Sequence, residues 1–373
     1  MNRLVTLSDL GYVNRGRSKH RPRNAPELYG GSYPFVQTAD IKHANLYLTE
    51  YEQTYSEIGL AQSRLWPIGT LCVTIAANIA DTAILGCEAC FPDSVIGFIP
   101  NEDKCDVRYV KYLFDTELQE SFRQLSQGVA QDNLSKDKLL SVKFCIPDLP
   151  IQRRIADILS AYDDLIENNR RRIAILEETA RLAYRKWFGG EVGRTATLGE
   201  IAEVVMGQSP ESKTYNSQGE GLPFHQGVTS FGFRHPSNEM WCTVGTRFAD
   251  EGDILFSVRA PVGRINVASE RIVIGRGLST MRARNKCQSW LLYTLKQYFS
   301  KEDMIGVGCI FASTTKKELL SVELPFPPEE DILAFERLAS PIDSQIKVLS
   351  KQSAALAAAR DMLLPRLMKG ESV

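Results

Sequence analysis

Six basic side chains gather near the N-terminus in a pattern that suits a polyanionic ligand. The run consists of Arg15, Arg17, Lys19, His20, Arg21 and Arg23, with no acidic residue between them. Clusters of this kind neutralise phosphate groups, so the run favours contact with a nucleic-acid backbone. A solvated basic loop explains the same run equally well.

Cysteine spacing offers a second candidate chemistry, a bound metal. Cys87 and Cys90 form a C-x-x-C pair, and Cys72 and Cys105 could supply two further thiolates. The second pair lacks the close spacing of a zinc site, and free cysteine is commonly a small core residue. We therefore expect reduced thiols and no metal.

The motifs of the commonest catalytic sites are missing. The sequence has no G-x-x-x-x-G-K-[ST] phosphate loop, no H-E-x-x-H helix, no G-x-S-x-G elbow and no Asn-Pro-Pro-Tyr of an adenine methyltransferase. Its four histidines, His20, His43, His225 and His235, are widely separated. We expect no catalytic residue and no cofactor.

Bulk composition indicates an ordinary folded protein. The 373 residues are 43% hydrophobic and 24% charged, with a formal net charge of −1, and this length suits two globular units. The N-terminus lacks the apolar run of a secretory signal, and the most apolar stretch, 71–87, contains Asn78 and Asp81. We expect a cytoplasmic protein without a membrane role.

Short matches at one fixed distance indicate an internal repeat. Leu139-Leu140-Ser141-Val142 matches Leu319-Leu320-Ser321-Val322, 180 residues further on. The same distance relates Gly128 to Gly308, Pro147 to Pro327, and Gly190-Glu191 to Gly370-Glu371. The chain therefore reads as two copies of one structural unit.

Nearer the start of each copy, the order of features persists while the distance drifts, as loop insertions would make it do. The matching segments are Thr6-Leu7 with Thr197-Leu198, Tyr33-Pro34-Phe35 and Gln37 with Leu222-Pro223-Phe224 and Gln226, and Gly69-Thr70-Leu71 with Gly252-Asp253-Ile254. Each copy should run from a short strand to a long terminal helix.

A heptad seam predicts that the helix closing the first copy packs against another helix. The segment 151–187 contains neither Gly nor Pro, and its seam consists of Ile155, Leu159, Tyr162, Ile166, Asn169, Ile173, Leu176, Ala180, Ala183 and Trp187. Asn169 is the polar position that could fix the register. Two helices bound to separate bodies are the alternative to a mutual pair.

The second copy predicts the partner seam. Its positions are Phe335, Ala339, Ile342, Ile346, Leu349, Ser353, Leu356, Arg360, Leu363 and Leu367. Pro341 and Pro365 should kink or terminate this helix, because proline cannot donate the backbone hydrogen bond.

We therefore predict a mixed α+β fold in which two globular domains of sheet and helix are separated by two long, coiled-coil-like helices that pack together. The expected borders are 1–150 and 191–328 for the globular domains, and 151–190 and 329–373 for the helices.

This organisation resembles the specificity subunits of type I restriction-modification systems. IPDLPIQRRIADIL at 146–159 resembles the family's proline-rich entry into its conserved helix, and LLPRLMKGE at 363–371 resembles its closing motif. The sequence departs from the family at Glu329-Glu330, where a Glu-Gln pair is common, and at Ile151-Gln152 in the first copy.

The resemblance implies a protein that reads DNA and performs no catalysis. Each globular segment would be a target-recognition domain for one half of a bipartite sequence, and the two long helices, running antiparallel, would set the spacing. Adenine methyltransferase subunits would dock along the helices, and a motor-nuclease subunit would complete the restricting complex. The helix residues expected to serve as partner and spacer surfaces are Ile155, Leu159, Tyr162, Ile166, Asn169, Ile173, Leu176, Ile342, Ile346, Leu349 and Leu356.

Base reading requires donors and acceptors on loops and strand ends. The first domain offers Lys19, Arg21, Arg23, Gln37, Gln127, Gln131, Asn133 and Lys136. The second offers His225, Gln226, Arg259, Arg264, Arg276, Ser313, Thr314, Lys316 and Lys317. For any one of these, a surface residue that touches nothing is the competing interpretation.

Three other functions fit the sequence less well. They are a specificity module for a related modification or phage-defence complex without the motor subunit, a coiled-coil scaffold with two protein-binding heads, and a stand-alone nuclease.

Overall fold

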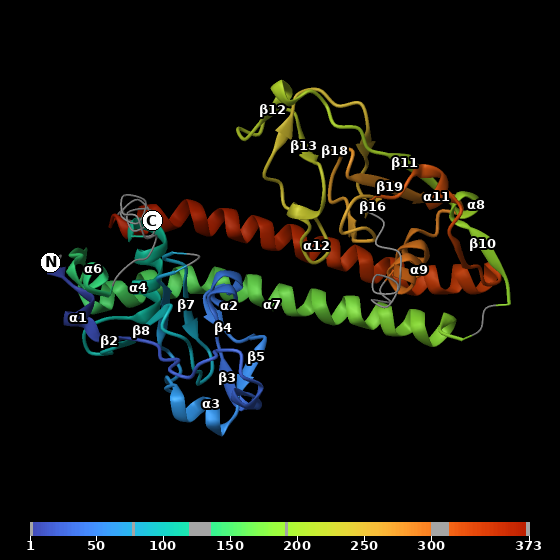
Figure 1. Ribbon diagram of the computed structural model, residues 1–373. Helices are drawn as coiled ribbons and strands as arrows, with labels where there is room; N and C mark the ends of the chain where they lie inside the picture. The colour runs from blue at the N-terminus through green and yellow to red at the C-terminus, as the bar shows by residue number, and fades with distance from the viewer. Residues whose placement is uncertain (1–2, 77–78, 119–135, 191–192, 300–312, 371–373) are drawn as a thin grey trace. The chain divides into compact units, whose positions relative to one another are not determined.

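The computed structural model describes residues 3–76, 79–118, 136–190, 193–299 and 313–370 (Figure 1). The expected DNA contacts Gln127, Gln131 and Asn133 lie outside these ranges. The chain folds as two compact units, residues 1–168 with 353–373, and residues 169–352.

The first unit begins with a mixed domain that we call head 1, from β1 to β9. Its strands are β1 (Arg3–Val5), β2 (Gly11–Arg15), β3 (Tyr29–Phe35), β4 (Tyr47–Leu48), β5 (Gln53–Tyr55), β6 (Leu71–Thr74), β7 (Thr82–Leu85), β8 (Val95–Pro100) and β9 (Phe144–Ile146). Its helices are α1 (Leu7–Leu10), η1 (Pro26–Leu28), α2 (Thr38–His43), α3 (Glu57–Gln62), α4 (Val107–Leu113), η2 (Phe114–Leu118) and α6 (Lys136–Ser141).

The second unit contains a corresponding domain, head 2, from β10 to β20. Its strands are β10 (Thr195–Thr197), β11 (Ala202–Met206), β12 (Tyr215–Asn216), β13 (Leu222–His225), β14 (Trp241–Cys242), β15 (Phe248–Ala249), β16 (Ile254–Ser257), β17 (Ile265–Val267), β18 (Ile272–Ile274), β19 (Leu278–Ala283) and β20 (Glu323–Pro325). Its helices are α8 (Leu198–Ile201), η3 (Ser212–Thr214), η4 (Val228–Ser230), α9 (Gln288–Phe299) and α11 (Lys316–Leu320).

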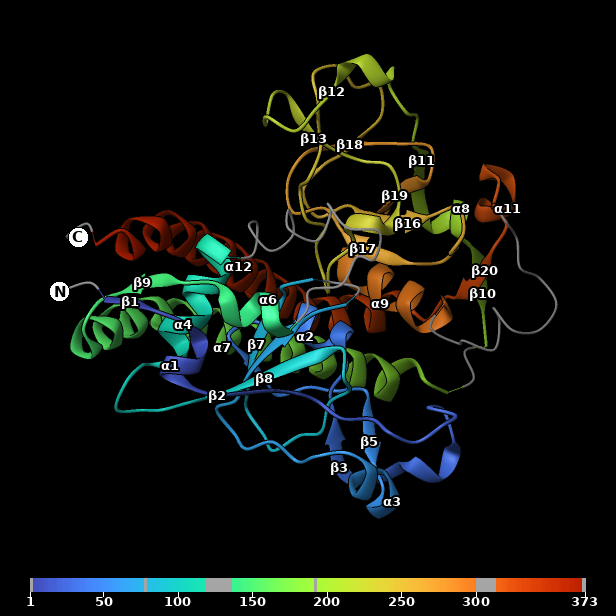
Figure 2. The ribbon, with the colours of Figure 1, turned by 60° about the vertical axis from the view of Figure 1, so that its left-hand side comes forward.

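The two heads share a four-stranded sheet of the same topology and register, to which head 1 adds β4 at one edge. Head 1 has the strand order β2-β8-β6-β7-β4, and head 2 has β11-β19-β16-β17. Leu71 of β6 pairs with Phe98 of β8, and Ile254 of β16 pairs with Met281 of β19 at the equivalent position. The first and last strands of each head also pair, β1 with β9 and β10 with β20 (Figure 2). The common sheet therefore represents the repeated unit.

The heads differ in their second sheets. Head 1 has the two-stranded sheet β3-β5, whereas head 2 has the five-stranded sheet β12-β14-β13-β18-β15. The central strands β6 and β16 are buried along their whole length, which explains their continuous apolar sequences. The predicted mixed fold with two domains and long helices is confirmed.

Two long helices contribute to both units. They are α7 (Leu149–Phe188) and α12 (Glu329–Met368), each of 40 residues. The expectation that Pro341 or Pro365 would terminate the second helix is wrong, because α12 continues through both. Both prolines are exposed, so water can hydrate the carbonyl groups that lose a backbone donor.

Within each unit α7 and α12 pack antiparallel and join the core of the head. In the first unit Ile155 and Leu159 of α7 share a core cluster with Leu367 of α12. In the second unit Ile173 packs with Ile346 and Leu349. The proposed borders between heads and spacer helices remain a prediction.

Not every position of the expected seam is buried. Asn169 is buried, Tyr162, Ile166, Leu176, Ile342 and Leu356 are half-buried, and Trp187 is exposed.

Candidate nucleic-acid interface

Four segments of head 2 meet at the end of β16, where several of the expected DNA contacts lie. The backbone N–H of Thr314 donates to the carbonyl of Val258, that of Val258 to Gly277, and that of Gly277 to Gln226, at 2.8, 2.9 and 3.1 Å. This hydrogen-bonded row places Gln226, Arg259 and Arg276 on adjacent segments.

The side chains on this row are available for contact. Gln226, Arg259, Arg276 and Ser313 are exposed, and no guanidinium of the two arginines bonds to the described part of the chain. A fifth segment joins them, because the Arg276 N–H donates to Ser209 Oγ at 3.2 Å and the Gln208 N–H donates to the Ile274 carbonyl at 3.0 Å. We call exposed Gln208, Gln226, Arg259 and Arg276 the edge cluster.

Glycines allow these segments to approach so closely. A Cβ on Gly277 would lie 2.3 Å from the Gln226 carbonyl oxygen, and one on Gly207 would lie 2.1 Å from the Gly275 oxygen. A Cβ on Gly275 would lie 2.9 Å from the Gln226 Cα. No larger residue fits at positions 207 and 277 without moving backbone, so the turn that carries Arg276 is held in place.

Head 1 repeats this framework with different side chains. In head 1 Phe35 and Cys90 form a parallel β-bridge between their backbones. In head 2 Phe224 and Val273 are paired in the same parallel manner. The backbone N–H of Arg17 donates to the Phe91 carbonyl, which matches the bond from Gln208 to Ile274 in head 2. The backbone N–H of Ile75 donates to the Ser94 carbonyl, which matches the bond from Val258 to Gly277. The head 1 positions that correspond to Gln208, Gln226, Arg259 and Arg276 are therefore Arg17, Gln37, Ala76 and Asp93.

Among the head 1 candidates, Arg23 lies at this framework. Both oxygens of the Asp93 carboxylate accept hydrogen bonds from Arg23 Nη2 at 3.0 Å. Gln37 is half-buried at the start of α2 and donates to Gln53 at 2.7 Å. The other candidates are spread more widely.

Lys19 and Arg21 form part of the loop that follows β2. Gln62 Oε1 accepts from the Lys19 N–H at 2.6 Å, and Arg21 Nη1 donates to the Ser18 and His20 carbonyls at 2.9 and 2.7 Å. Lys136 Nζ donates to Asn14 Oδ1 at 3.1 Å on the face of β2. Arg21 is thus occupied in shaping its own loop.

His225, one of the expected DNA contacts, is buried inside head 2. Its side chain is 1% exposed, and its ring nitrogens lie 2.8 Å from Ser230 Oγ and 3.1 Å from Asn238 Oδ1. Burial lowers the pKa of His225, which favours the neutral ring. The residue therefore holds the loop after β13 together and cannot reach a groove.

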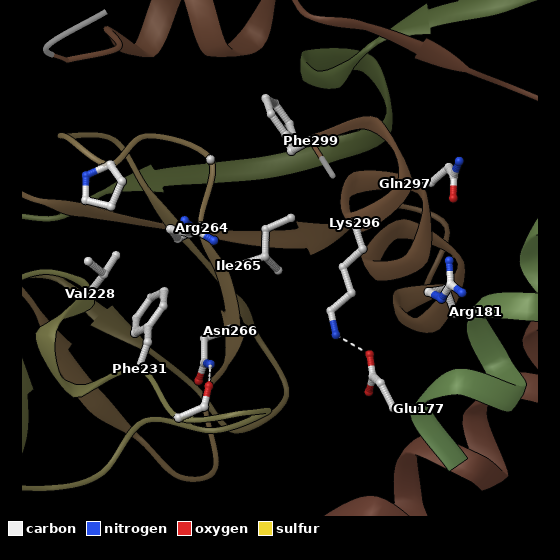
Figure 3. Close-up of a pocket in the computed structure, with 13 residues that line it drawn as sticks. Glu177, Arg181, Val228, Phe231, Arg264, Ile265, Asn266, Lys296, Gln297 and Phe299 are labelled. Carbon is white, nitrogen blue, oxygen red and sulfur yellow. Dashed lines mark hydrogen bonds and ion pairs between the residues drawn. The ribbon is translucent and has the colours of Figure 1, made fainter. Parts of the chain in front are cut away.

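The remaining candidates of head 2 lie beside the edge cluster. Thr315 caps α11, with its hydroxyl accepting from the Glu318 N–H at 3.3 Å, so Lys316 and Lys317 occupy the exposed first turn. Exposed Arg264 lines a pocket of about 570 Å³ with Phe231, Asn266 and Phe299 (Figure 3). Neither lysine has an ion-pair partner in the described residues.

A buried charge cluster fastens head 2 to both long helices. Glu177 of α7 accepts from Arg234 Nη1 at 2.8 Å and pairs with Lys296 of α9, as Figure 3 shows for the lysine. Asp343 of α12 pairs with Arg234 and accepts from Tyr293 Oη at 3.1 Å. Burial lowers the pKa of Lys296, an effect that Glu177 opposes. We call these five residues the head 2 clamp.

Head 1 has a smaller version of the same arrangement. Asp163 of α7 is 5% exposed, accepts a hydrogen bond from Tyr112 of α4 and pairs with Arg360 of α12. The pairing with Asp163 thus explains why the second seam has a charged residue, Arg360, among its apolar positions. One carboxylate joins the head to both helices.

Sequence reasoning missed Gln208 and the equivalence of Asp93 with Arg276, and it placed Arg17 only in a basic run and not among the base-reading residues. Thr6 and Thr197 lie 191 residues apart, and the same distance relates Gly16 to Gly207. Extending that match by ten residues would have aligned Arg17 with Gln208.

No metal centre is evident in the described ranges, where no three His, Cys, Asp or Glu side chains are arranged to hold an ion. Burial raises the pKa of the Cys105 thiol to about 12. In the same residues no helix is long and apolar enough to cross a membrane.

A duplicated mixed fold with two unlike sets of exposed side chains defines a two-headed recognition protein. The family described as Type I restriction modification DNA specificity domain matches the chain twice, over residues 3–178 and 194–356. The chain belongs to this family, and the two matches confirm the internal repeat.

Similar proteins agree with this assignment. A putative type I restriction enzyme MjaX specificity subunit from Methanocaldococcus jannaschii is 31% identical over 73% of this chain and 69% of its own length. The MjaIX specificity subunit of the same organism is 23% identical over 98% of this chain and 92% of its own. The S subunit of a type I system from M. genitalium has the same fold, with a TM-score of 0.63, 16% identity, and coverage of 99% and 96% of the two chains.

Proposed function

We propose that the chain is the DNA-specificity subunit of a type I restriction-modification complex, in which each head reads one half of a bipartite sequence. The observation that carries this proposal is the repeated framework, on which head 1 presents Arg17 and Gln37 while head 2 presents Gln208 and Gln226. One backbone with two sets of groove-reading side chains suits two different half-sites. A scaffold with two protein-binding heads offers no reason for this pattern.

A head exchange tests the proposal. Residues 197–322 would be replaced by the corresponding segment of a related subunit with a known target, and methylated sites would be sequenced in a host that also carries the methyltransferase subunit. We expect one half-site to change and the other to persist. If both halves changed together, the two-reader proposal would be wrong.

The long helices are proposed to dock methyltransferase subunits. In the first unit Ile151, Ile158 and Leu165 of α7 recur every seven residues and are exposed, beside the buried Ile155 and Leu159. An exposed apolar stripe on a helix is typical of a protein–protein interface. A motor-nuclease subunit and a cytoplasmic location complete the proposal.

The chain itself is proposed to be non-catalytic. Purified alone, it should transfer no methyl group from S-adenosylmethionine and cut no DNA. DNA binding that weakens steeply with salt would separate this reader from a protein scaffold, because phosphate contacts release counterions. Methyl transfer by the purified chain would contradict the assignment.

A further inference from the structure

The matched frameworks of the two heads separate positions that agree from positions that differ. Arg64 and Arg247 agree, because Arg64 lies two residues before the Trp66–Ala89 bridge and Arg247 two residues before the Ala249–Ile272 pair. Lys136 and Lys316 agree as well, each being the first residue of the helix that precedes the last strand. An agreement between heads that read different sequences indicates a role independent of sequence.

Position 276 shows the sharpest difference. Head 2 has an arginine there, on a turn whose flanking glycines are locked against Gln226 and Gly207. Head 1 has Asp93, which would repel a phosphate. The Asp93 carboxylate is occupied by Arg23, and its backbone carbonyl accepts from Arg15 Nε at 3.0 Å. In head 1 an Asp93–Arg23 ion pair therefore stands where head 2 presents a guanidinium with no partner in the described chain.

We propose that Arg276 reads a guanine in the half-site of head 2, while Arg247 contacts a phosphate. This inference rests on the proposed function. A guanidinium held on a rigid turn, with no partner in the described chain, can form the two parallel hydrogen bonds that guanine O6 and N7 accept.

Arg247 fits a phosphate for a different reason. It is exposed, and its backbone carbonyl accepts from the Ile274 N–H at 3.0 Å, in the sheet that carries the edge cluster. Its counterpart Arg64 donates to Tyr12 Oη at 2.8 Å and lies 4.3 Å over the Trp66 ring. A positive charge at the same place in both heads suits contact with the DNA backbone, because the phosphates are the same in every DNA sequence.

The test compares R276A, R276K and R247A in the complex reconstituted with its methyltransferase subunits. Methylation of a randomised DNA library would be sequenced, and affinity would be measured against salt. For R276A we expect discrimination at one base pair of one half-site to fall about 5- to 150-fold, with the other half unchanged. R276K should lose part of the same discrimination, because a flexible ammonium does not present the two fixed, parallel donors of a guanidinium. R247A should weaken all sequences alike and lower the salt slope by about 1.

Each other outcome has a definite meaning. A wild-type complex that methylates no defined bipartite site would overturn the proposed function itself. A normal wild-type site that R276A and R276K leave unaltered would overturn only the assignment of Arg276, as would a uniform loss of affinity in both variants. Selective relaxation by R247A would overturn its role at a phosphate.

Discussion

Asp163 of α7 and Asp343 of α12 are equivalent residues of the repeat, since they lie 180 positions apart and each accepts a hydrogen bond from a tyrosine of its own head. The cation that each carboxylate binds differs in origin. Asp163 pairs with Arg360 of the opposite long helix, whereas Asp343 pairs with Arg234 of the head itself. The tyrosine contact is thus the part of the clamp that both heads retain.

Adjacent glutamates of α7 allow a controlled test of the head 2 clamp. Glu177→Gln leaves the nearly buried Arg234 and its neighbour Lys296 without their shared anion, so the free energy of unfolding should fall by about 3 kcal/mol. Glu178→Gln is the matched control, because Glu178 pairs with Arg181 on the surface and its loss should change the free energy of unfolding much less. Urea denaturation measures the free energy of unfolding of both variants. Equal losses would mean that the clamp stabilises head 2 no more than a surface ion pair does.

A second pair of substitutions tests the close packing at the edge cluster. Gly277→Ala forces a methyl group to within 2.3 Å of the Gln226 oxygen, so it should destabilise head 2 by about 1–3 kcal/mol. Gly227→Ala is the control, because a Cβ there meets no atom within 4 Å. Thermal melts of the two variants should therefore differ. Equal melting temperatures would mean that the turn carrying Arg276 can move.

The organisation of the chain could be predicted from sequence, whereas the position of individual contacts could not. A repeat and a seven-residue apolar period can both be recognised in the sequence itself, and they indicated the two heads and the long helices. Burial of His225 depends on Ser230 and Asn238, which reach it from a loop that has no pattern of its own. A position at the end of a strand-like entry suggested exposure, yet β13 is buried at Pro223, Phe224 and His225 alike.

The prolines of α12 illustrate a second limit. Pro341 has a strong local tendency to end a helix, but Ala339 and Ile346 on either side of it are buried against the rest of the second unit. Tertiary packing of that face outweighs the loss of one hydrogen bond. The equivalence of Asp93 and Arg276 was hidden for another reason, since it is encoded in backbone pairing and not in residue type.

Buried histidines predict loss of stability in acid. Burial lowers the pKa of His225 and of the half-buried His235 from the ordinary value of 6.5, which favours the neutral ring of both in the folded protein. Below pH 6.5 the unfolded chain binds protons at these histidines more readily than the folded chain does. The stability contributed by their lowered pKa is therefore fully present above pH 6.5 and is lost as the pH falls. The urea midpoint should therefore decrease between about pH 7 and pH 5.

His225→Asn identifies the source of that decrease. Asparagine can still bond to Ser230 or Asn238 but does not titrate, so the variant should show a shallower dependence of the urea midpoint on pH. Substitution of exposed His43 by Asn is the control and should leave the dependence unchanged. A His225 variant with the full wild-type slope would assign the acid sensitivity to other groups.

The long helices should set the number of base pairs between the two half-sites. Because α7 and α12 pack antiparallel within each unit, an insertion in only one of them shifts its seam against the other. Four residues would therefore be inserted in both, after Asn168 and after Gln352, where the two units divide. At 1.5 Å per residue each insertion adds about 6 Å, close to two base pairs of DNA. With both heads untouched, methylome sequencing should show the original half-sites separated by about two more base pairs.

The single insertions serve as controls and should lower the melting temperature. A folded double variant that methylates sites with the original gap would leave the helices as a docking surface and remove their role in spacing.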